Sequence, residues 1–123
     1  MAFKRYIVEL GMGTDLHGQD VTKAAIRAVR DAVSRSCLCG LFEIVGLKRP
    51  EDMHIRLHIA CPAPDRLDRD AVMAEVPFGD VEFSTAEGGM KADGLHVASL
   101  GEGDKITVAL AALTVLVDWP DRP

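Results

Sequence analysis

An aspartate and a histidine stand two positions apart near the amino terminus, within a segment that contains three glycines. They are Asp15 and His17, in the run GMGTDLHGQD at residues 11–20, which we call the glycine segment. An imidazole titrates near neutral pH and a nearby carboxylate can orient it, so the pair is a candidate for general acid–base catalysis. The alternative is structural: Asp15 closes an Asx-type turn and His17 bonds neighbouring backbone, and both shape the loop.

The glycine segment is also predicted to bind a small polar or anionic molecule. Glycines allow positive φ angles and a close approach to the backbone. The helix expected to follow begins with unpaired N–H groups at the positive end of its dipole, where a carboxylate or phosphate can rest. The residues of this part predicted to bind the ligand are Gly11, Gly13, Gly18, Gln19, Asp20 and Lys23.

Three residues further along the chain complete the predicted ligand site. Arg56 lies between His54 and His58 on an alternating strand, and a ring of such arginines near a symmetry axis can bind an anion; the alternative is that this face is exposed or pairs across an interface. Lys91 and His96 lie in the glycine-rich residues 86–104. That segment is either a lid that supplies a cation to the ligand or a solvated hairpin tip.

No metal or cofactor is expected. Asp15 and His17 give two ligands, whereas zinc needs three or four. The glycines at 11, 13 and 18 miss the GxGxxG spacing of dinucleotide-binding proteins by two residues, and no phosphate-loop lysine with serine or threonine occurs. Cys37 and Cys39 form a C-x-C pair and Cys61 precedes a proline; all three are predicted to be buried structural thiols.

Composition predicts one cytoplasmic domain over residues 1–123. A net charge of −5 disfavours nucleic acid and an anionic membrane surface as partners. The longest apolar run, residues 106–117, is too short to cross a bilayer. Residues 1–4 lack the pattern of a secretion signal, and three cysteines give no disulfide framework.

Hydrophobic periodicity predicts six main elements. The first strand ends where the glycine segment begins, and Asp20 then caps a helix whose apolar stripe runs from Val21 to Val33. A turn of helix is expected around residues 41–45 and a brief pairing at 96–98. For the last strand a helix is the competing prediction, because of its alanines. The strands are predicted at residues 3–10, 53–60, 81–85 and 105–118, and the second helix at 67–75.

The order β-α-β-α-β-β predicts an α+β fold, with a mixed four-stranded sheet and two helices on one face. The last strand is apolar on both sides, and no further element remains to cover the second face. We therefore expect a homo-oligomer. The polar side chains of residues 54–58, with Glu9, would face solvent or a neighbouring subunit. This order is similar to that of the Bacillus-type chorismate mutases and the RidA (YjgF) imine deaminases, which implies a trimer with ligands between subunits.

The residues Gly11-x-Gly13-x-Asp15-x-His17-Gly18 give the pattern GxGxDxHG. This pattern resembles the hallmark of a small family of conserved hypothetical proteins of unknown function, the "Lin" family. Residues 19–32 are similar to that family too, and residues from 87 onward more loosely. Because the resemblance implies no activity, two hypotheses stand. One is an enzyme acting on a small polar or anionic metabolite at a subunit interface; the other is a non-catalytic, metabolite-binding or structural homo-oligomer.

Overall fold

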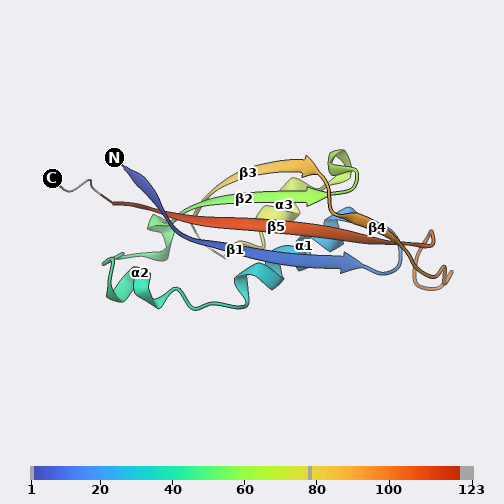
Figure 1. The fold of residues 1–123 in the computed structure, drawn as a ribbon, viewed down its shortest axis with the longest axis horizontal. Coiled ribbons are helices and arrows are strands. Elements are labelled where there is room, and N and C mark those ends of the chain that lie inside the picture. Colours follow the sequence, from blue (N-terminus) through green and yellow to red (C-terminus); the bar gives the residue numbers. More distant parts are fainter. Residues whose placement is uncertain (1, 78, 120–123) are drawn as a thin grey trace.

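The computed structural model describes residues 2–77 and 79–119, which form an α+β fold of two layers (Figure 1). One layer is a mixed sheet of five strands. Helices α1 and α3 lie together behind it, so that they cover one face. In chain order the strands and helices are β1 (Phe3–Asp15), α1 (Val21–Val33), α2 (Cys39–Glu43), β2 (His54–Cys61), α3 (Arg69–Met73), β3 (Asp80–Glu87), β4 (Met90–Asp93) and β5 (Lys105–Asp118), with short 3-10 turns η1 (Pro50–Asp52) and η2 (Pro64–Arg66).

Strand β5 is the centre of the sheet. The order is β1-β5-β2-β3, in which β5 is antiparallel to β1 and to β2, and β2 is parallel to β3. The prediction of a strand at 105–118 is therefore confirmed. The prediction of four strands is wrong, because Met90–Asp93 pairs with the beginning of β5 as a fifth. Pairing was expected at residues 96–98 instead, and these lie in a loop.

Strand β1 continues through half of the glycine segment, so the prediction that it ends at Leu10 is wrong. Its pairing with β5 includes Gly11 opposite Ala111 and Gly13 opposite Ala109. The two glycines are needed because α1 crosses directly over them. A Cβ atom on Gly11 would lie 2.2 Å from the carbonyl oxygen of Ala28. These glycines therefore serve helix–strand packing and do not form a loop.

Helix α1 occurs where its periodicity predicts it. Asp20 caps its first turn, as expected, and small residues on its buried side let it lie close to the sheet. The second predicted helix, α3, is shorter than residues 67–75 and begins after its cap Asp68. No helix among the described residues is long and apolar enough to cross a membrane.

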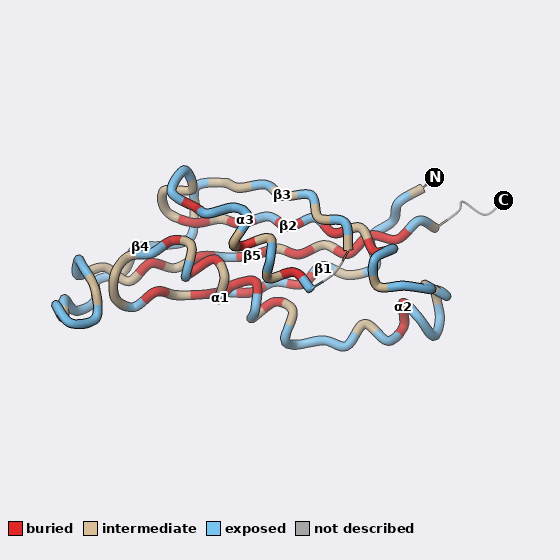
Figure 2. Tube along the Cα trace, turned by 180° about the vertical axis from the view of Figure 1, so that it is seen from behind, coloured by how far each residue is buried: buried red, intermediate tan, exposed pale blue. Residues whose placement is uncertain are grey.

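The buried core lies between the helices and the sheet (Figure 2). Most of its side chains come from α1, β2 and β5; α3 adds Val72, α2 adds Leu41, and the connecting segments add Met53, Leu67 and Val76. Cys61 belongs to this core, as predicted, whereas Cys37, just before α2, and Cys39, its first residue, are exposed. The prediction of buried thiols is thus wrong for the C-x-C pair, because its segment passes the edge of the core.

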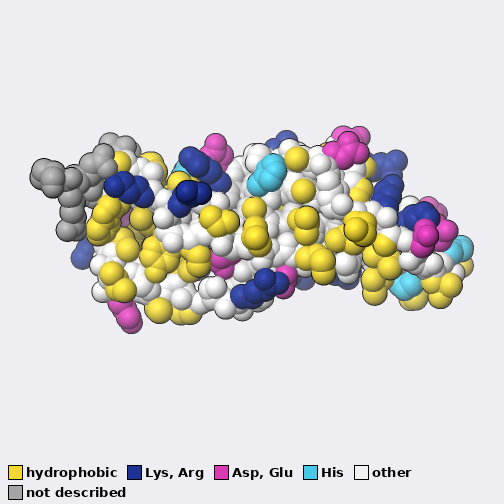
Figure 3. Space-filling view, viewed as in Figure 1, with side chains coloured by type: hydrophobic (Ala, Val, Ile, Leu, Met, Phe, Trp, Pro, Cys, Tyr) yellow, Lys and Arg dark blue, Asp and Glu magenta, His cyan; other side chains and the backbone are white. Residues whose placement is uncertain are grey.

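The opposite face of the sheet, which we call the open face, is covered by no element of the described chain. Its apolar band consists of Val8, Leu10 and Met12 on β1 with Leu110 on β5, which are 48, 63, 56 and 45% exposed. Figure 3 shows hydrophobic side chains running across the middle of this face. Strands β2 and β3 complete it with polar side chains.

Candidate functional site

Asp15, the predicted catalytic acid, is buried at the end of β1, with only 4% of its surface exposed. Its Oδ2 accepts a 2.8 Å hydrogen bond from the backbone N–H of Asp20. Its Oδ1 lies 3.7 Å from the guanidinium of Arg27, which is on α1. The carboxylate therefore fixes the turn between β1 and α1.

Three of the N–H groups at the predicted anion site already have acceptors within the chain. Besides the N–H of Asp20, those of Thr22 and Lys23 donate to Oδ1 of Asp20 over 2.9 and 3.2 Å. Protein carboxylates thus occupy the place at the helix start where a ligand was expected. Lys23 itself extends from the exposed side of α1.

The second half of the glycine segment joins the start of α1 to the loop at residues 94–104. His17 Nδ1 lies 3.3 Å from the carbonyl oxygen of Leu95, and Gln19 Oε1 accepts from the N–H of Lys105 at 3.1 Å. Gly18, at φ +103°, passes so close to Gly101 that a Cβ on the latter would lie 2.7 Å from Gly18. Together these contacts hold the loop against the second half of the glycine segment.

The structure does not bring Arg56 to the glycine segment within one chain, because β5 lies between β2 and β1. Arg56 Nε is instead 3.4 Å from Glu82 on β3. Along the same pair of strands, His54 Nδ1 is 3.2 Å from Asp80, and His58 Nδ1 is 2.7 Å from the hydroxyl of Ser84. Each of these three β2 side chains therefore has a partner on β3 of the same chain.

Lys91 and His96, the other two predicted ligand-binding residues, lie in different places. Lys91 borders an open depression of about 640 Å³ where β2 and β3 end, together with Asp65 and Glu87. His96 is exposed in the loop, next to the Leu95 that contacts His17. In the part of the chain that the structure describes, no three histidine, cysteine or acidic side chains are placed to hold a metal ion.

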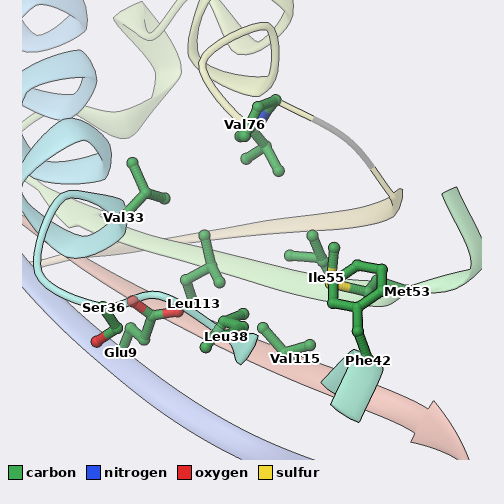
Figure 4. A pocket seen from close by; sticks show the side chains of 11 residues that line it. Glu9, Val33, Ser36, Leu38, Phe42, Met53, Ile55, Val76, Leu113 and Val115 are labelled. Atoms are coloured by element: carbon green, nitrogen blue, oxygen red, sulfur yellow. The ribbon is translucent and has the colours of Figure 1, made fainter. Parts of the chain in front are cut away.

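A second cavity, of about 130 Å³ and partly open, lies between the sheet, the end of α1 and α2 (Figure 4). Its walls are apolar apart from Glu9 and Ser36. Glu9 is 9% exposed, and burial raises the pKa of its carboxyl group. The expectation that Glu9 joins the polar face of β2 is wrong, because Glu9 pairs with Leu113 on the helix-covered face. The signal in the sequence is an acid inside the otherwise apolar run from Tyr6 to Leu10.

Comparison with known proteins identifies relatives but no activity. The family model for the conserved hypothetical protein Lin0512_fam matches residues 5–115. A crystal structure of an FtsZ-like protein of unknown function from Nostoc punctiforme is similar, with a TM-score of 0.88 and 41% sequence identity. The match covers 97% of this chain and 99% of that one. No curated protein matches the chain.

Proposed function

The chain belongs to the Lin0512 family of conserved hypothetical proteins, and we propose that it works as a non-catalytic homo-oligomer assembled through the open face. The observation that supports this proposal is the apolar band. Leu10 alone is 63% exposed, and it lies among three other large apolar side chains of β1 and β5. Contiguous exposed apolar surface of this kind marks an interaction site. The face takes up one whole side of the sheet (Figure 3).

The edge of the sheet at β1 is protected against pairing with another strand. Side chains from α1 and the residues just after it bind the outward backbone groups of β1. Arg27 donates to the carbonyl of Thr14 at 2.7 Å. Asp31 accepts from the N–H of Met12 at 2.8 Å. Arg35 donates to the carbonyl of Leu10 at 3.1 Å. Charged groups at a sheet edge oppose edge-to-edge association.

The other edge is protected in a similar way. The guanidinium of Arg69 donates to the carbonyl of Phe83 on β3 at 3.4 Å and lies 4.8 Å from the centre of its ring. Both edges thus carry arginines that bind backbone oxygens. Association through the open face, and not extension of the sheet, is the mode that these features favour.

A second copy of this chain is the partner that suits the open face. The apolar band lies beside a row that carries both charges, since Arg56 pairs with Glu82 across β2 and β3. Such a face offers apolar area in one part and both signs of charge in another, so different parts of the open faces of neighbouring copies can meet around a closed ring. Three copies with their open faces turned inward are the arrangement we propose, with the helices outside.

Sedimentation velocity tests this assembly. We expect the wild type to sediment as an oligomer at micromolar concentration, and Leu10→Glu to sediment as a folded monomer, because a carboxylate would be buried without a partner. Ile44→Glu is the matched control: Ile44 is 83% exposed on the segment after α2, away from the open face, and this variant should keep the wild-type size. A monomeric wild type, or an oligomeric Leu10→Glu variant, would refute the proposal.

The second candidate is an enzyme that uses Asp15 and His17. It is favoured by one observation: the half-buried imidazole of His17 lies against the loop that also carries His96. Thermal-shift screening against small carboxylates, phosphates and cyclic amides tests it, because a ligand that binds only the native state raises the melting temperature. This hypothesis predicts that His17→Asn loses the shift but keeps its oligomeric size. An equal shift in both proteins would exclude a role for His17 in binding.

A further inference from the structure

We propose that the cavity beside Glu9 binds a small amphipathic amine, with the ammonium group paired to the Glu9 carboxylate and the apolar part filling the rest. This inference goes beyond assembly and does not depend on it. The cavity is on the helix-covered side of the sheet, whereas the apolar band is on the open face.

The carboxylate of Glu9 lacks a partner of its own. Glu9 is nine-tenths buried as a residue, its oxygen atoms keep a small contact with solvent, and within residues 2–77 and 79–119 no hydrogen bond or ion pair reaches its side chain. Burying an ionised carboxylate among apolar groups is unfavourable unless a counter-charge or donor joins it. An ammonium group brings both, with a positive charge and three donors. An amine would therefore supply the positive charge and the hydrogen-bond donors that the Glu9 carboxylate lacks.

The cavity is polar at one end and apolar at the other. In Figure 4, Glu9 and Ser36 lie together at one end, while Ile55, Met53 and Phe42 lie at the opposite end. Leu38, Leu113 and Val115 line the space between them. A ligand with a charged head and a hydrocarbon body would therefore have one preferred orientation, with its head at Glu9.

Size and access limit the ligand further. A cavity of about 150 Å³ lined by apolar side chains holds benzene in another protein. The 130 Å³ available here therefore suits an aryl or branched alkyl group of similar size. Phe42 is 41% exposed and Ser36 is exposed, so both form a rim through which a small molecule can enter. Benzylamine has the required head and body, and serves as the probe.

The experiment compares benzylamine with benzyl alcohol and benzoate, which keep the ring and change the charge. Each is titrated into ¹⁵N-labelled full-length protein and followed by amide chemical shifts. We expect benzylamine to shift the amides of Leu38, Phe42 and Ile55, and to bind more tightly than the other two. Benzyl alcohol binding as tightly as benzylamine, or no shifts up to about 10 mM benzylamine, would overturn the proposal.

Two variants test whether the charge of Glu9, and not that of another acid near the cavity, determines the affinity for benzylamine. Glu9→Gln preserves the shape of the side chain and removes the charge, so benzylamine affinity should fall about thirtyfold or more. Glu43→Gln removes an exposed acid from α2, near the same cavity, and should leave affinity unchanged. Unchanged affinity in Glu9→Gln, or an equal loss in both variants, would contradict the pairing. Should Glu9→Gln fail to fold, the wild-type comparison of amine with alcohol still decides.

Discussion

A Cβ atom on Gly13 would lie 2.1 Å from the carbonyl oxygen of Ala24, which is on the first turn of α1. No side chain fits in that space, so the strand and the helix are in contact through their backbones. Gly11 meets Ala28 in the same way one turn later. The two glycines form a groove in which α1 lies, and their spacing of two residues along β1 places both on one face of the sheet.

Gly13→Ala should therefore destabilise the protein strongly. The added methyl group has to push α1 away from the sheet, and we expect a loss of about 2–4 kcal/mol in the free energy of unfolding. Urea denaturation measures this loss. Thr14→Ala changes the neighbouring position, which faces the other side of β1, and should cost less than about 1 kcal/mol. Equal stabilities of Gly13→Ala and Thr14→Ala would show that α1 does not need this groove.

Asp15→Asn should cost more stability than His17→Asn. The Asp15 carboxylate is buried and accepts from the N–H of Asp20, so its loss should cost about 1–3 kcal/mol. The contact of His17 with Leu95 is longer, at 3.3 Å, and its loss should cost less than about 1 kcal/mol. Urea denaturation and hydrogen exchange at the Asp20 amide report both effects. The reverse order of the two losses would mean that Asp15 is not the group that fixes the turn.

Local patterns predict α1 and β5 well because each signal lies within its own element. The apolar stripe of α1 and its cap Asp20 are contiguous in sequence, and β5 is recognisable from its β-branched residues. Glycines usually interrupt strands, so the local pattern at Gly11 and Gly13 predicts a loop. Their actual role depends on the backbone of Ala24 and Ala28, at least eleven residues away, which no local pattern contains.

The face of a strand that the helices cover, and the strands with which it pairs, are harder to predict than the strand itself. Alternation separates Glu9 from Val8 and Leu10, and it favours the more apolar set, Val8 and Leu10, as the side that the helices cover. In the structure Glu9 lies on the helix-covered side, and Val8 and Leu10 lie on the open face. For that reason the sequence alone does not predict a cavity at Glu9. No local pattern predicts β4, because residues 90–93 form a strand through pairing with the start of β5, which is a separate segment of the chain.

Asp31 should make the protein sensitive to acid. The N–H of Met12 and the guanidinium of Arg35 lower the pKa of its carboxyl group below the ordinary value. A lowered pKa in the folded state adds stability above the unfolded pKa, and this stability is lost as the pH falls through the folded pKa. The difference in melting temperature between wild type and Asp31→Asn should thus be largest near pH 7 and shrink below about pH 4. Glu102→Gln, on the exposed loop, provides the control.

Glu9 should affect stability in the opposite direction. Burial raises the pKa of its carboxyl group, so the folded state favours the protonated form. This preference stabilises the protein below the unfolded pKa of about 4.3 and is lost as the pH rises through the folded value. At pH 7 Glu9→Gln should therefore be more stable than the wild type, by about 0.5–1.5 kcal/mol in urea denaturation, and the gain should vanish near pH 4. A gain of the same size at both pH values would show that ionisation of Glu9 is not its cause.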